Sequence, residues 1–111
     1  MDIEELLAEH TDEVATLFRG LVNHITEAAE WTDLRVYAGW HGAGFHHGEL
    51  GYLVGVFPRE DSVRVLFEQG HLLGEAEFLE GSGQTRYVDF TEFSTSRVAT
   101  VDDMLDRALS P

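Results

Sequence analysis

Residues 50–67, which read LGYLVGVFPREDSVRVLF, contain two segments of alternating polarity. Every second residue is apolar, from Leu50 in the first segment and from Val63 in the second. A period of two predicts β-strands, and the composition of Pro58–Ser62 between them predicts a turn. Parallel neighbours need a crossover of about a dozen residues or more, so we expect these two strands to form an antiparallel hairpin.

Further strands are expected on both sides of this hairpin. Residues 34–40 alternate in the same way, and residues 87–90 are the last strand candidate. The stretch Gly42–Gly48 is ambiguous, because its glycines suit a turn while Phe45 suits a short strand. Together these segments predict an antiparallel sheet of about five strands.

Helical periodicity appears at both ends of the chain. We expect a short helix over residues 2–9 and a longer one over residues 12–29, with Thr11 as the N-cap of the second. Thr100 followed by Asp103 resembles a capping box for a closing helix. Helices that flank a block of strands in 111 residues predict an α+β fold and a single domain over residues 1–111.

The charge balance excludes some classes of partner. The chain has 21 acidic and 7 basic residues, for a formal net charge of −14. Nucleic acid and anionic membrane surfaces both require clustered cations, so we expect neither as a partner. The sequence contains no cysteine, which excludes a disulfide, a thiol nucleophile and a cysteine-bound metal.

The cations are all arginine, and lysine is absent. This composition suits a protein of a high-salt cytoplasm, where surface carboxylates keep the chain hydrated, and it also suits a high-GC genome. Either origin would make the acidity a property of the organism rather than of a site. We expect a cytoplasmic location, because the N-terminus MDIEELL has neither a basic nor an apolar signal region.

Two segments, Leu66–Leu73 and Leu79–Val88, resemble the YdhG-like family of domains of unknown function. The second segment contains the characteristic Leu-Glu-Gly-Ser-Gly followed by Arg86. Upstream, Trp40 and Phe45 align with the family signature Lys-Trp-Gly-x-Pro-x-Tyr. The resemblance covers nearly the whole chain, although several cationic family positions are replaced here, by Gly39, Gln84 and Tyr87.

The resemblance implies a two-layer sandwich, with the helices packed on one face of the antiparallel sheet. Some members of the family are described as frataxin-like intracellular iron chaperones. Iron binding and delivery to an iron-accepting protein is therefore the leading functional expectation, with iron held weakly and no tightly bound cofactor.

The first candidate metal site is the acidic N-terminal segment. Asp2, Glu5 and Glu9 would share one face of a helix, with Glu13 following at the same step and His10 adding a nitrogen ligand. Carboxylate oxygens suit iron ions. The competing interpretation is a solvated acidic helix face.

A second candidate metal site lies in the glycine-rich stretch. His41, His46 and His47 fall within seven residues, and imidazoles suit Zn, Ni or Fe. Strand geometry sends His46 and His47 to opposite faces, so the competing interpretation is a set of exposed loop histidines.

The alternative function is a small-ligand or protein-binding module. Backbone amides of Gly81-Ser82-Gly83 would form an anion nest completed by Arg86, and Trp40 and Phe45 would line the same pocket. The competing interpretation is a tight turn in which Arg86 pairs with a nearby acid.

No arrangement of side chains indicates catalysis. Ser82 lacks the strand–turn–helix setting of a hydrolase nucleophile, and aromatic residues such as Tyr52 and Phe57 are expected in the core. We therefore expect a non-enzymatic protein, as a monomer or a homodimer.

Overall fold

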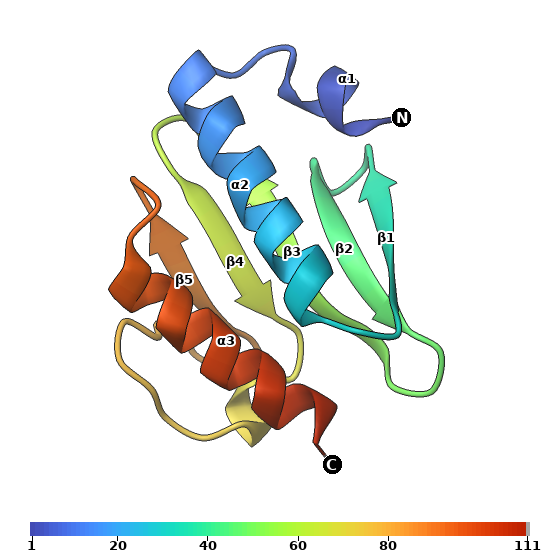
Figure 1. The fold of residues 1–111 in the computed structure, drawn as a ribbon, viewed down its shortest axis with the longest axis vertical. Coiled ribbons are helices and arrows are strands. Elements are labelled where there is room, and N and C mark those ends of the chain that lie inside the picture. The colour runs from blue at the N-terminus through green and yellow to red at the C-terminus, as the bar shows by residue number, and fades with distance from the viewer. Residues whose placement is uncertain (111) are drawn as a thin grey trace.

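The computed structural model describes residues 1–110 and shows a helical layer packed on a sheet (Figure 1). None of the helices formed by these residues is long and apolar enough to cross a membrane. The elements in chain order are α1 (Ile3–Leu7), α2 (Asp12–Ala28), β1 (Thr32–Tyr37), β2 (Gly42–His47), β3 (Gly51–Pro58), β4 (Val63–Phe67), the 3-10 turn η1 (Gly70–Leu72), β5 (Arg86–Phe90) and α3 (Thr95–Leu109).

The five strands form one antiparallel sheet in the order β1-β2-β3-β4-β5. At the expected hairpin Pro58 pairs with Val63, and the Arg59 amide donates to the Ser62 carbonyl at 2.8 Å. Helices α2 and α3 lie across one face of the sheet and leave the other face uncovered (Figure 1). The predicted α+β fold with a five-stranded antiparallel sheet is confirmed.

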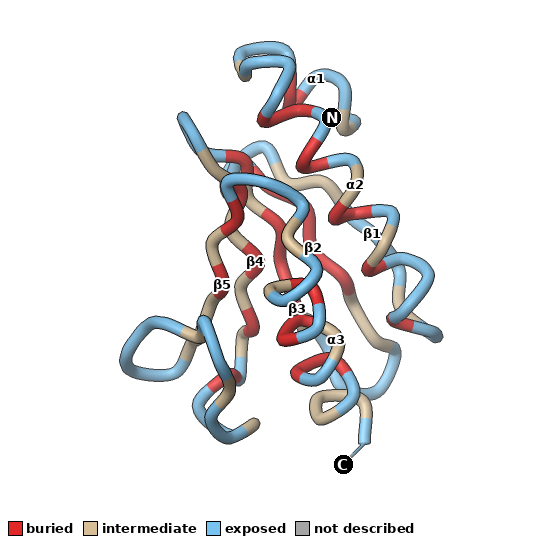
Figure 2. The backbone as a smooth tube through the Cα atoms, turned by 60° about the vertical axis from the view of Figure 1, so that its left-hand side comes forward, coloured by how far each residue is buried: buried red, intermediate tan, exposed pale blue. Residues whose placement is uncertain are grey.

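The core lies between the helices and the sheet. Alternate strand residues such as Val54, Val56 and Val65 are fully buried there, against Phe18 and Leu21 of α2. Figure 2 shows the buried residues on α2, α3 and the inner strands, while most connecting loops are exposed. Each large apolar side chain buried in this way stabilises the fold by roughly 1.5–3 kcal/mol.

Two helix boundaries differ from the predictions. α1 ends at Leu7 rather than Glu9, because Ala8–His10 form a turn. α3 begins six residues before the predicted start, with Ser94 rather than Thr100 as its N-cap. Thr100 does not cap the helix but lies within it, where its hydroxyl donates to the Glu77 carbonyl at 3.0 Å. The sequence pattern of a threonine followed three residues later by an acid therefore does not distinguish an N-cap from a buried threonine within a helix.

The ambiguous stretch after Trp40 is a full strand, β2, whereas Trp40 itself lies in the preceding turn. Glycine occupies β2 where side chains from other strands need the space. A Cβ added at Gly44 would lie 3.2 Å from a Tyr52 ring carbon and 3.3 Å from a Tyr37 ring carbon. The glycines of β2 therefore accommodate aromatic rings rather than a turn.

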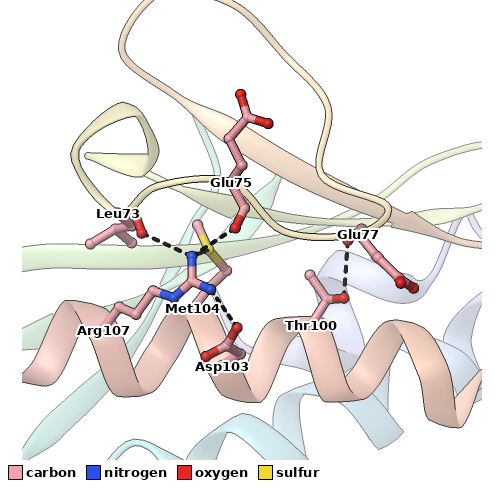
Figure 3. A network of polar contacts seen from close by, with 7 residues as sticks. All are labelled: Leu73, Glu75, Glu77, Thr100, Asp103, Met104 and Arg107. Carbon is pink, nitrogen blue, oxygen red and sulfur yellow. Dashed lines mark hydrogen bonds and ion pairs between the residues drawn. The ribbon is translucent and has the colours of Figure 1, made fainter.

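The long connection between β4 and β5 is fastened to α3 by Arg107 (Figure 3). Its Nη1 donates to the Leu73 carbonyl at 2.9 Å and to the Glu75 carbonyl at 3.0 Å, and its Nη2 donates to Asp103 at 2.6 Å. Together with the bond from Thr100, these contacts hold a segment without strand or helix structure against the helix.

Candidate functional site

The uncovered face of the sheet carries a group of stacked rings, which we call the aromatic cluster: Tyr37, Trp40, His46 and Tyr52. Ring centroids are 4.3 Å apart for Tyr37 and Trp40, and 5.3 Å apart for Trp40 and Tyr52. The His46 ring stacks on Tyr52 at 5.3 Å. These residues come from β1, β2, β3 and the β1–β2 turn, so the sheet register itself brings them together.

Glycines below the rings make this stacking possible. A Cβ at Gly55 would collide with the Tyr52 hydroxyl and lie 2.7 Å from a Phe57 ring carbon, and a Cβ at Gly42 would also collide with Phe57. Real Cβ contacts are essentially never this short. The rings of Tyr52 and Phe57 therefore lie against the backbone of β2 and β3. This close contact restricts the movement of both rings.

Two members of the aromatic cluster, Tyr52 and His46, have pKa values shifted in the direction that favours the neutral form. Burial raises the pKa of the Tyr52 phenol above its ordinary value. Burial, followed by the Arg35 charge, lowers the pKa of His46 below its ordinary value. The Tyr37 hydroxyl lies 2.6 Å from His46 Nε2 and donates a hydrogen bond to the neutral imidazole. The cluster is thus an uncharged, mostly apolar surface.

A pocket of about 300 Å³ opens beside Trp40. We call it the Trp40 pocket, and its lining residues are Trp40, His41, Phe57, Pro58, Arg59, Arg64 and Leu66. Trp40 is 49% exposed, so part of its indole is available to a ligand. No carboxylate is among the lining residues, which is notable in a chain with a net charge of −14.

The two arginines of the Trp40 pocket differ in their bonding. Arg64 donates to both oxygens of Asp89, at 2.8 and 3.0 Å, and stacks over the Tyr87 ring. These hydrogen bonds raise the pKa of Arg64 above its ordinary value. The Arg59 side chain makes no hydrogen bond or ion pair within residues 1–110. Arg59 is therefore the guanidinium available to an anion.

Sequence reasoning placed Trp40 in a pocket but missed the other lining residues. Among these is Phe57, which was expected in the core together with Tyr52. A signal was present in the alternation of β3. Gly55 and Phe57 share the face opposite Val54 and Val56, and a glycine next to aromatic residues on one face indicates a ring lying on the sheet.

The acidic residues expected to bind iron are not gathered into one site. Asp2 caps α1 by accepting from the Glu5 amide at 2.8 Å, and the helix ends before Glu9. Glu13 lies in the first turn of the next helix, α2. Within residues 1–110, no three His, Cys, Asp or Glu side chains are grouped so as to hold a metal ion.

The histidines of the second candidate site separate, and one gains a new neighbour. His46 joins the aromatic cluster, whereas the Nδ1 of His47 accepts from the amides of Glu49 and Leu50 in the β2–β3 turn. His41 instead lies beside His10, a member of the other candidate site, with their Nε2 atoms 2.6 Å apart.

Trp40, Phe45 and Arg86 were expected to line one pocket, but the sheet separates Trp40 from the other two. Phe45 is 1% exposed in the core. Arg86 pairs with Phe67, a core residue, and lines a separate cavity of about 310 Å³. Directly paired residues share a face, so Arg86 points to the helical side, whereas Trp40 lies on the uncovered side.

The Gly81-Ser82-Gly83 segment lies in the loop before β5, where Gly83 begins a turn, and Arg86 bonds to this loop. Gly81 and Gly83 have φ values of 110° and 70°, which favour glycine. Arg86 Nη1 donates to the carbonyls of Gly83 and Thr85 at 2.8 and 2.7 Å. This guanidinium nitrogen therefore donates to backbone oxygens and does not complete an anion nest with the glycine amides.

Comparisons with protein-family models, curated proteins and solved structures found no match to this chain. The resemblance to YdhG-like domains therefore stays a prediction.

Proposed function

We propose that this domain binds a small molecule that combines a planar aromatic ring with an anionic group, and that it does so in the Trp40 pocket. The observation that supports this most directly is the half-exposed indole of Trp40, fixed by contacts with Tyr37 and Tyr52. A ring that is already held in place loses little conformational freedom when a ligand stacks on it.

Arg59 is the reason why we expect the ligand to be an anion. The acidic surface of the chain repels anions at a distance, so an anionic ligand requires a local cation and a lining without carboxylates. The Trp40 pocket has both. Its volume is at the lower end of small-molecule sites, which favours a single-ring or double-ring metabolite over a peptide.

The proposed role is binding without catalysis. Beside the Trp40 pocket, the Tyr37 hydroxyl and the His46 imidazole are hydrogen-bonded to each other. Iron binding, an iron-accepting partner protein, a monomeric or homodimeric state and a cytoplasmic location also stay predictions from the sequence.

The test uses the indole Nε1–H signal of Trp40 in a ¹H–¹⁵N NMR spectrum. Trp31→Phe removes the other tryptophan, which is 85% exposed and does not line the pocket, so one indole signal remains. We expect 2-naphthoate to shift this signal saturably. The neutral 2-naphthamide and the non-aromatic cyclohexanecarboxylate should bind more weakly.

Arg59→Ala should raise the dissociation constant for 2-naphthoate about fivefold, since a partly exposed charge pair contributes about 1 kcal/mol. Arg35→Ala is the matched control, because it removes an arginine outside the pocket lining. Equal binding of naphthoate and naphthamide, or equal effects of the two arginine variants, would contradict the proposal.

A further inference from the structure

His10 and His41 converge from segments that are distant in the sequence. His10 lies between α1 and α2, and His41 lies in the turn between β1 and β2. Their Nε2 atoms are 2.6 Å apart, and their ring centroids are 4.9 Å apart. Both nitrogens therefore face the same small volume at the protein surface.

The backbone on the His10 side is firmly held. Leu6 and Leu7 bury α1 in the core, with 1% and 4% exposure. The Arg19–Glu4 ion pair, at 2.6 Å, ties α1 to α2. The His10 amide then donates to the Leu7 carbonyl at 3.0 Å, so the imidazole projects from a fixed turn.

On the other side, His41 adopts a left-handed conformation with φ of 51°. This region costs a non-glycine residue about 1 kcal/mol or more. The His41 amide donates to the Ala38 carbonyl at 3.2 Å, and the buried strand β2 begins at the next residue. The structure thus keeps a histidine at a strained position beside a second histidine.

A direct hydrogen bond between two exposed imidazoles offsets little of this cost, because water competes for both nitrogens. A shared metal ion would bind both nitrogens at once. Two imidazole ligands of a tetrahedral Zn²⁺ ion lie about 3.3 Å apart, given Zn–N distances of about 2.0–2.1 Å. Small rotations of two surface side chains reach that separation.

We propose that His10 and His41 form a two-nitrogen site for a divalent transition-metal ion of the Zn²⁺, Ni²⁺ or Cu²⁺ class. Imidazole ligands favour these ions, whereas Mg²⁺ and Ca²⁺ require oxygen ligands. Since no third His, Cys, Asp or Glu of residues 1–110 completes a group here, water fills the remaining positions and the site is open. It shares His10 with the acidic segment expected to bind iron, but it uses none of the carboxylates of that segment.

The test is calorimetric titration of the protein with ZnCl₂ at pH 7.5 and 0.3 M KCl, where salt screens unspecific attraction to the acidic surface. We expect saturable binding that weakens at least tenfold in His10→Ala and in His41→Ala. His71→Ala is the matched control, because His71 is also exposed but lies in η1, after β4, with its Nδ1 2.8 Å from the Gln84 carbonyl oxygen. Broadening of amide signals by Cu²⁺ should centre on residues 9–11 and 40–42.

Three outcomes would overturn the site: equal affinity in His10→Ala and His71→Ala, a loss in only one of the two pair variants, or Mg²⁺ binding as tight as Zn²⁺. Glu5→Gln combined with Glu9→Gln separates this site from the acidic segment. The double variant should leave Zn²⁺ affinity unchanged, and a loss equal to that of His10→Ala would assign binding to the carboxylates instead. His41 also lines the Trp40 pocket, but Arg59→Ala leaves both imidazoles in place. Saturable Zn²⁺ binding in this variant, together with weakened 2-naphthoate binding, would separate the two proposals.

Discussion

The environment of His46 in the folded protein lowers its pKa, and this shift should make the stability of the protein depend on pH. Burial in the aromatic cluster lowers its pKa, with a smaller contribution from the Arg35 charge that outweighs the opposing effect of Asp33. In the folded protein the imidazole therefore binds a proton less readily than in the unfolded chain, where its pKa is near the ordinary 6.5. Folding stability linked to this group must fall as the pH falls through that value.

The test compares the stability of the wild type with that of His46→Gln, whose side chain does not titrate. Between pH 7.5 and pH 5, the free energy of unfolding of the wild type should decrease more than that of the variant, and the difference should level off below the folded-state pKa. Urea unfolding at several pH values measures this. Parallel pH profiles for the two proteins would show that burial of His46 has no such effect.

Single residues were predictable where the signal is local. Thr11 was expected to cap α2, and its hydroxyl accepts from the Val14 amide at 3.2 Å. Residue roles that depend on another segment were not predictable. The residues near Thr100 do not indicate that its hydroxyl bonds to the Glu77 carbonyl. Likewise, the residues near His10 do not indicate that its ring lies beside His41.

At the scale of elements, α3 both covers the core and anchors a loop. Its inner face buries Val101, Met104 and Leu105, while Arg107 bonds to two carbonyls of the β4–β5 connection (Figure 3). Because these carbonyls have no strand partners, the position of the loop depends strongly on one side chain.

Arg107→Met should therefore destabilise the fold by about 1–3 kcal/mol, because it removes hydrogen bonds to two backbone oxygens, of which the bond to Leu73 is partly buried. Arg107→Lys keeps the charge without the guanidinium fork and should lie between wild type and Arg107→Met. Urea unfolding gives the free energies, and hydrogen exchange of residues 73–79 should accelerate. The control is Arg35→Met, for which a change within about 0.5 kcal/mol is expected; unchanged loop exchange in Arg107→Met would refute the anchoring role.

The elements themselves were largely predictable from periodicity. Alternation identified β3 and β4, which bury every second residue on one side. Residues 87–90 were expected as the last strand, and they lie in β5. β2 remained ambiguous because its glycines are explained by rings from neighbouring strands. That information lies in the sheet register, which only tertiary structure supplies.

At the scale of the whole molecule, the dominant property is the net charge of −14. Three ion pairs involve arginine, so many carboxylates of residues 1–110 have no cationic partner. One concentration of carboxylates is the cavity between α2 and α3, which is lined by Glu27, Asp102 and Asp106. Of these, Asp102 lies 2.6 Å from His24 Nε2. Like charges at this density oppose the compact state.

Added salt should therefore stabilise the protein. The melting temperature should rise by several degrees from low salt to 0.5 M KCl, with 1 kcal/mol corresponding to about 4–8 °C at this size, and NaCl at equal ionic strength should act alike. Glu27→Gln combined with Asp106→Asn should raise the low-salt melting temperature and reduce the gain from salt. A melting temperature independent of KCl would rule out charge repulsion as a limit on stability.

The meander order of the sheet also bears on how the chain folds. Each strand pairs with its neighbour in the sequence, and the first three connections span at most four residues. Folding rates rise as contacting residues become closer along the chain, because short loops cost little entropy to close. β1 to β4 can therefore assemble by successive hairpins, whereas β5 must wait for closure of residues 68–85. We infer that the slowest step in forming this sheet is the docking of its last strand.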